Sequence, residues 1–179
     1  SLKFDVEKLM WEMDFMIKHY ITGFLNRKLN QDEESKIRTA LLGLCETLAK
    51  EERVFVHRDF HSRNLMILKN DLLLLDFQDA RIGPRQYDLV SLLKDSYVAL
   101  KEKTRNELLS YYLQRMEQEQ GQPIARTSFL KIFDSMSIQR NLKAIGTFAF
   151  QYMEHKNERY LEYLDPTLQH IRDTIHSQP

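Results

Sequence analysis

The sequence contains very little cysteine, with Cys45 as the single example in 179 residues. A lone cysteine excludes an internal disulfide and fits a reducing compartment. Cys45 also falls on the apolar side of a helical pattern, as a core residue would. The sequence therefore favours a cytoplasmic location.

The sequence also lacks an excess of charge of either sign and any long apolar run. Basic and acidic residues number 26 each, so no overall field draws the chain to nucleic acid or to an anionic membrane surface. No apolar run approaches the roughly 18 residues of a membrane-spanning helix, and no signal-peptide core follows Ser1. We therefore expect a soluble protein that binds neither nucleic acid nor membrane and meets its partners at a local site.

Internal repeats and low-complexity linkers are absent, and the length suits one compact domain, residues 1–179, with 42% hydrophobic residues for its core. Apolar residues recur at three- and four-residue steps over most of the chain, which predicts helices. Asn30 followed by Glu33 predicts a capping box, and Asp165 with Pro166 predicts the N-cap and first residue of a last helix. The ranges expected to be helical are 4–29, 31–50, 87–119, 127–152 and a segment after 165.

Three short apolar runs, residues 54–56, 65–68 and 72–75, interrupt this helical pattern. Turn-forming residues separate the last two runs, so we expect a hairpin there. The first two runs look too hydrophobic to lie on a surface, and strand signals stop beyond Gly83 and Pro84. The predicted fold class is α+β, predominantly α, with a small β insertion near the middle of a helical body.

The β insertion carries an unusual density of charged and hydrogen-bonding groups. The segment HRDFHSRN places Asp59 and Asn64 five residues apart between the first two strands, and Asp76 follows the third strand. Phosphoryl transfer from a nucleotide needs a base to position the attacking hydroxyl and hard oxygen ligands for magnesium. The pattern H-R-D-x-x-x-x-N followed by a strand and an Asp supplies both, which favours a kinase that uses ATP and Mg²⁺.

Other interpretations of these residues remain open. Asp59, Asn64 and Asp76 are also typical turn residues whose side chains bond their own backbone. The segment HRDFH is also H-x-D-x-H, so His57, Asp59 and His61 could be ligands of a transition metal in a hydrolase. The metal-hydrolase interpretation assigns no role to Asn64 or Asp76. A non-catalytic helical interaction module is a further alternative.

The segments HRDFHSRNLMI and LLLLDFQDA resemble the catalytic loop and metal-binding segment of the aminoglycoside phosphotransferase and choline kinase family, relatives of protein kinases that phosphorylate small molecules. The resemblance spans essentially the whole chain and implies the C-terminal, large lobe of a protein-kinase-like fold. It implies that Asp59 is the catalytic base and that Asn64 and Asp76 hold magnesium and the nucleotide. It also implies that His57 supports the loop and that His61 contacts the transferred phosphate.

The sequence argues for a small substrate. Only residues 77–86 separate Asp76 from the next predicted helix, too few for the activation loop and peptide shelf of a protein kinase. Asp88 resembles a family residue that braces the catalytic loop, although a helix N-cap is an equally good reading. Asp79 either assists Asp76 or solvates the turn.

Within the family, the runs GPRQYDLVSLLKDSY and QRNLKAIGTF resemble the cell-wall-recycling kinases that phosphorylate the anomeric hydroxyl of N-acetylmuramate and N-acetylglucosamine. An aminoglycoside or choline kinase is the alternative within the family. Arg140 looks like a helix-surface residue, and Trp11 and Glu12 look like packing and solvated-face residues rather than pocket residues.

The chain departs from the family pattern before His57. Residues 5–50 read as helices, without a glycine-rich loop or a strand-borne lysine for the nucleotide phosphates. We therefore expect the N-terminal nucleotide-binding lobe to be absent from this chain. The chain alone should then be inactive, and apolar surface near the catalytic strands should favour its self-association.

Overall fold

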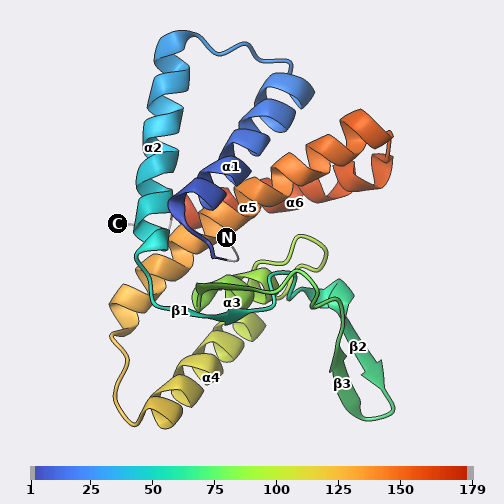
Figure 1. The fold of residues 1–179 in the computed structure, drawn as a ribbon. Coiled ribbons are helices and arrows are strands. Elements are labelled where there is room, and N and C mark those ends of the chain that lie inside the picture. Colours follow the sequence, from blue (N-terminus) through green and yellow to red (C-terminus); the bar gives the residue numbers. More distant parts are fainter. Residues whose placement is uncertain (1–2, 177–179) are drawn as a thin grey trace.

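The computed structural model describes residues 3–176, which form a mostly helical body with two small β ribbons (Figure 1). Cys45 is fully buried as its position predicts, and this burial raises the pKa of its thiol to about 12. The helices are α1 (Val6–Met16), η1 (Ile17–Phe24), α2 (Gln31–Ala49), η2 (Ser62–Asn64), α3 (Gln86–Leu93), α4 (Glu102–Gln120), α5 (Arg126–His155), η3 (Glu158–Tyr163) and α6 (Leu164–His176).

The N-terminal helices begin where the sequence indicates. Asp5 caps α1 by accepting a hydrogen bond from the Lys8 backbone N–H at 2.9 Å. The helix continues without a break into η1, whose wider π-helical turns the apolar periodicity does not predict. Before α2, the Asn30 side chain accepts from the Glu33 N–H at 2.9 Å, and the Glu33 carboxylate accepts from the Asn30 N–H at 3.0 Å. The predicted capping box is confirmed.

Helix α5 is the longest helix and the centre of the packing. Helices α1, α3 and α6 and the π-helix η1 all pack against it, and Figure 1 shows it running the length of the helical body. Met13, Met136 and Ile145 are fully buried in this packing. The N-terminal and C-terminal helices thus share one framework, on which the middle of the chain is mounted.

The β structure consists of two antiparallel two-stranded ribbons. Strand β1 (Arg53–Val56) pairs with β4 (Arg81–Pro84), with Val56 opposite Arg81. Strand β2 (Leu65–Leu68) pairs with β3 (Asp71–Leu74) in the predicted hairpin. The sequence did not predict β4, because its only apolar side chain lies between an arginine and a glycine.

The expectation that the apolar runs at 54–56 and 65–68 are both buried is wrong. The β2–β3 hairpin projects from the helical body in Figure 1, and Ile67 and Leu72 are 77% and 66% exposed. Hydrophobicity alone does not identify which apolar strands find a partner in the same chain. We call the exposed apolar residues of this hairpin the hairpin patch: Met66, Ile67, Leu68, Leu72, Leu74 and Leu75.

The last helix begins earlier than the sequence predicts. The 3-10 helix η3 runs directly into α6 at Leu164, so Asp165 lies inside the first helical turn and is not the N-cap. The predicted break before α5 is confirmed, since Gly121 ends α4 with a φ of 66°. That conformation is accessible to glycine at little cost.

Candidate active site

The segment HRDFHSRN forms a loop between β1 and β2, and a carboxylate from another element holds its first residues. Asp88 of α3 accepts the backbone N–H of His57 at 2.6 Å and that of Arg58 at 2.9 Å. The Arg58 backbone has a φ of 79°, a conformation unfavourable for a non-glycine residue, and these two bonds help to hold it. The N-cap reading of Asp88 is wrong, because α3 has Arg85 as its N-cap and Asp88 points at the loop.

Asn64 and Asp76 lie together at the open end of the hairpin. The Asn64 backbone carbonyl accepts the N–H of Leu75 at 2.9 Å, which places the next residue, Asp76, beside Asn64. The Asn64 amide nitrogen donates to the backbone carbonyl of Asp59 at 2.9 Å, so its side-chain oxygen is left for other ligands. Among the described residues, none forms an ion pair or a hydrogen bond with the Asp76 carboxylate.

This donor set fits a magnesium ion. A carboxylate and an amide oxygen are hard ligands of the kind that Mg²⁺ accepts, with water and phosphate oxygens completing its coordination. No group of three or more His, Cys, Asp or Glu residues in the described part of the chain is placed to hold a metal. The geometry therefore gives no support to the H-x-D-x-H reading of His57, Asp59 and His61.

Two further residues of the loop are held by contacts that the sequence reading missed. Asp95, just after α3, accepts the backbone N–H of Ser62 at 2.8 Å and that of Tyr97 at 2.8 Å. The Arg63 guanidinium stacks on the Tyr97 ring at 3.9 Å and bonds the Tyr163 hydroxyl. Asp95 follows Asp88 by seven residues, a two-turn spacing that could have indicated a second brace.

A buried carboxylate lies beneath the loop. Glu12 of α1 is only 2% exposed, so the expectation that it lies on a solvated face is wrong. It accepts a hydrogen bond from Gln139 at 3.0 Å and lies 3.6 Å from the Arg58 guanidinium. The exposed Asp79 carboxylate lies 3.7 Å from the same guanidinium. Asp79 thus pairs with Arg58 and does not assist Asp76. Trp11 is 57% exposed, with the Lys8 ammonium over its ring.

A cavity of about 90 Å³ opens beside Asp59 and His61, with Arg140 and Lys143 of α5 in its wall. Arg140 is only 7% exposed, so its assignment to the helix surface is wrong. Burial lowers the pKa of His61, and the nearby Arg140 charge lowers it further. His61 is therefore predominantly neutral at pH 7. The Asp59 carboxylate has neither a hydrogen bond nor an ion pair within residues 3–176, which leaves it free for a substrate hydroxyl.

His57 lies behind the loop rather than in this cavity. It is 4% exposed, packs edge-on against Phe60, and borders a mostly apolar cavity of about 460 Å³ between β1, α3 and α4. Neither ring nitrogen has a hydrogen-bond partner among the described residues. The predicted site residues thus divide into Asp59, His61, Asn64 and Asp76 on the open side and His57 and Asp88 behind.

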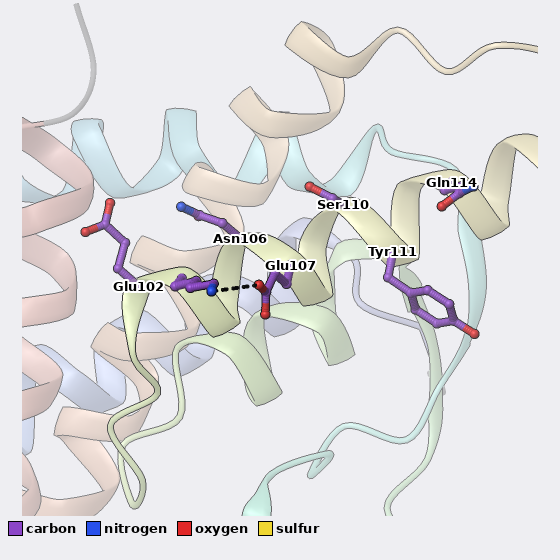
Figure 2. A pocket seen from close by; sticks show the side chains of 7 residues that line it. Glu102, Asn106, Glu107, Ser110, Tyr111 and Gln114 are labelled. Carbon is purple, nitrogen blue, oxygen red and sulfur yellow. Dashed lines mark ion pairs between the residues drawn. The ribbon is translucent and has the colours of Figure 1, made fainter.

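A concavity of about 710 Å³ on α4 holds none of these residues. Figure 2 shows its lining side chains along the outer face of α4, where Lys103 and Glu107 form an ion pair at 3.9 Å. All of the lining residues are exposed and come from this single helix. It is a groove in a helix surface without buried polar groups.

The fold and the site together define a class of protein, the kinase-like folds. These present an H-R-D loop, an Asn and an Asp that follows a strand at one edge. Residues 8–123 match the family model described as "Phosphotransferase enzyme family". The chain belongs to this phosphotransferase enzyme family.

Three similar proteins bear the name N-acetylmuramate/N-acetylglucosamine kinase. The one from Neisseria meningitidis serogroup B is 31% identical over 95% of this chain and 51% of that protein. Those from Pseudomonas aeruginosa and Pseudomonas putida are 32% and 29% identical over 87% and 98% of this chain, and 48% and 52% of those proteins. The chain spans about half the length of these relatives.

A solved structure has a similar fold. The crystal structure of the aminoglycoside phosphotransferase APH(2'')-Ib with ADP bound matches with a TM-score of 0.54 and 19% identity, over 94% of this chain and 53% of that chain. This likeness supports the kinase-like fold of the predominantly helical chain. None of the helices in the described range is both long and apolar enough to cross a membrane.

Proposed function

We propose that the protein to which this chain belongs transfers phosphate from ATP to the anomeric hydroxyl of an N-acetylated amino sugar. The observation that carries the proposal is the free Asp59 carboxylate at the cavity mouth, with Asn64 and Asp76 beside each other on the neighbouring hairpin. The names of the relatives support the choice of acceptor. Such an enzyme would work in the cytoplasm, where ATP is available.

Each site residue has a role in this proposal. Asp59 positions the acceptor hydroxyl and takes its proton as the phosphate is transferred. Asn64 and Asp76 hold magnesium, which neutralises the phosphate oxygens when it is bound. His61 faces the transferred phosphate as a neutral hydrogen-bond donor. His57 and Asp88 act behind the loop and keep Asp59 in place.

The second half of the nucleotide site would come from a further lobe of the same protein. Two observations support this: the chain spans about half the length of its relatives, and the hairpin patch is exposed beside Asn64 and Asp76. An apolar surface of that kind suits a packed lobe or an adenine ring. Because phosphoryl transfer needs positioning from both sides, residues 1–179 alone should have no useful kinase activity.

The charge of the cavity argues against aminoglycosides and choline as acceptors. Both are cations, whereas Arg140 and Lys143 place two positive charges opposite the single carboxylate of Asp59 in the cavity wall. Transfer of a cationic amine from water into such a wall is unfavourable. A neutral or anionic sugar avoids this cost.

A substrate panel on the complete protein tests the proposal. Phosphate should appear on the anomeric oxygen of N-acetylglucosamine or N-acetylmuramate, and kanamycin and choline should not react. Phosphate on kanamycin or choline alone would overturn the choice of acceptor and leave a kinase. Activity with zinc but not magnesium would favour a metallohydrolase.

The Asp59→Asn variant should lower kcat by roughly 10²- to 10⁴-fold, the usual value of general-base catalysis, with unchanged thermal unfolding. Asp173→Asn is the matched control, because Asp173 is exposed on α6 and, among the described residues, bonds only Gln169 of its own helix. Near wild-type turnover in Asp59→Asn would refute the assigned role.

A further inference from the structure

The cavity beside Asp59 is bordered by two cations whose charges the described residues do not balance. Arg140 and Lys143 are three residues apart on α5, so they share one face of the helix. Neither forms an ion pair with a carboxylate between residues 3 and 176. Asp59 is the only acidic residue in the wall, so the two cations outnumber the carboxylates by one. The wall therefore carries one excess positive charge.

The Arg140 side chain is held in place and is left with an unused donor. Its Nε donates to the Ser91 hydroxyl at 2.5 Å, and Ser91 in turn donates to the Tyr87 carbonyl at 3.0 Å. Its Nη1 atom is buried and has no hydrogen-bond acceptor among residues 3–176. A buried guanidinium donor without an acceptor is costly, and an oxygen of a bound anion would remove that cost.

The size of the cavity limits what that anion can be. Its volume of about 90 Å³ is far below the roughly 300 Å³ of a small-molecule pocket, so it holds one substituent and not a whole sugar ring. Neither Asn64 nor Asp76 lines it, so the residues that would hold the metal lie outside this cavity. A carboxylate on the acceptor fits both restrictions.

We propose that Arg140 and Lys143 form an anion subsite that reads a carboxylate on the acceptor sugar and favours acidic over neutral sugars. This inference rests on the proposed function. Of the two sugars in the relatives' name, N-acetylmuramate carries a carboxylate on its lactyl ether and N-acetylglucosamine does not. Arg140 supplies hydrogen bonds with a fixed geometry, and Lys143 supplies a second charge.

The experiment compares the two sugars in the complete protein and in its Arg140→Met and Lys143→Met variants. Each variant should lower kcat/KM for N-acetylmuramate by roughly 10- to 100-fold through KM, the value of a charged hydrogen bond, and leave N-acetylglucosamine within about threefold. Arg140→Lys should restore part of the preference, because it keeps the charge. Lys131→Met is the matched control on the exposed face of α5 and should change neither sugar.

Two outcomes would overturn the subsite. An equal loss of kcat for both sugars would place these cations on the transferred phosphate. Unchanged selectivity in a variant with lower thermal stability would make Arg140 a structural residue only.

Calorimetric binding separates this proposal from the proposed function. If neither sugar is phosphorylated, the proposed acceptor fails, and the subsite is still judged by whether the protein binds N-acetylmuramate more tightly than N-acetylglucosamine. Loss of that difference in both variants supports the subsite. Equal binding of the two sugars by the unmodified protein rejects it.

Discussion

At the scale of single residues, the loop that carries Asp59 depends on a carboxylate buried below it. Glu12 is nearly inaccessible, and its partners Gln139 and Arg58 come from the other end of the chain and from the loop itself. A charge buried in this way is stable only with its partners in place. Glu12 therefore couples the position of the loop to the packing of α1 on α5.

The Glu12→Gln variant should lower the free energy of unfolding by about 3 kcal/mol, because it leaves the mostly buried Arg58 guanidinium with only the exposed Asp79 carboxylate as a partner. Urea denaturation measures this change. Glu46→Gln on the exposed side of α2 is the control and should stay within about 0.5 kcal/mol. Equal stability of the two variants would show that the Glu12 charge contributes nothing.

The sequence revealed the site residues whose neighbours are close in the chain. Asp59 and Asn64 share one loop, and Asp76 follows from the hairpin that begins there, so a short pattern contains all three. Arg140 and Glu12 reach the site from helices far away in the sequence, and their own segments look like ordinary amphipathic helices. Only the packing of α1 and α5 shows that these charges point inward.

At the scale of elements, the crossing of α1 and α5 requires a residue without a side chain. A Cβ atom on Gly146 would lie 2.7 Å from the Met16 Cα, closer than such atoms approach. Backbone atoms cannot move aside as a flexible side chain can. Gly146 therefore lets the N-terminal helix pack closely against the central one.

The Gly146→Ala variant should lower the free energy of unfolding by about 1–3 kcal/mol, because the added methyl group pushes α1 away from α5. Gly43→Ala is the matched control in α2, where an added Cβ meets no atom within 4 Å. It should raise stability by about 0.5–1 kcal/mol through helix propensity. Chemical denaturation of both variants gives the comparison, and a stabilised Gly146→Ala would contradict the close crossing.

Element prediction succeeded where periodicity is regular and failed where it depends on partners. The capping box of α2 and the β2–β3 hairpin have local signals, and both are present. Strand β4 forms because β1 and the segment at Phe4 provide hydrogen-bond partners for its backbone. The residues of β4 itself do not indicate a strand. The exposure of the hairpin patch follows likewise from the absence of a covering element among residues 3–176.

At the scale of the whole molecule, buried histidines make stability depend on pH. Burial lowers the pKa of His19, and the Lys18 charge lowers it further against the opposing effect of Glu154. Burial likewise lowers the pKa of His170, although its bond to the Asp95 carbonyl acts in the other direction. The unfolded chain therefore binds more protons than the folded one near the ordinary histidine pKa, so stability rises with pH there.

The free energy of unfolding, measured by urea denaturation, should accordingly decrease as the pH is lowered from about 7.5 to about 5.5. The decrease should be at most about 1.4 kcal/mol per pH unit for each histidine. The measurement stops at that pH because burial raises the pKa of Asp88 and of Asp134. A raised carboxyl pKa makes stability increase as the pH falls, which is opposite to the effect of the histidines. His19→Gln should flatten the profile. His176→Asn, exposed on α6, should leave it unchanged. A profile that rises towards acid would refute the linkage.

The hairpin patch determines how residues 1–179 behave alone. Its leucine, isoleucine and methionine side chains lie together on a projecting ribbon with nothing over them in the described structure, and water contact with such a surface is unfavourable. We predict that this chain self-associates as its concentration rises, as measured by light scattering after size-exclusion chromatography. Ile67→Lys should shift the chain towards monomer. Ile175→Lys makes the same substitution at an exposed isoleucine of α6 and should not have this effect. A monomer at every concentration would contradict the prediction, and equal effects of both variants would place the contact elsewhere.

In the complete protein the proposed second lobe would cover the hairpin patch. In that protein, Ile67→Lys should weaken nucleotide binding instead of dispersing aggregates.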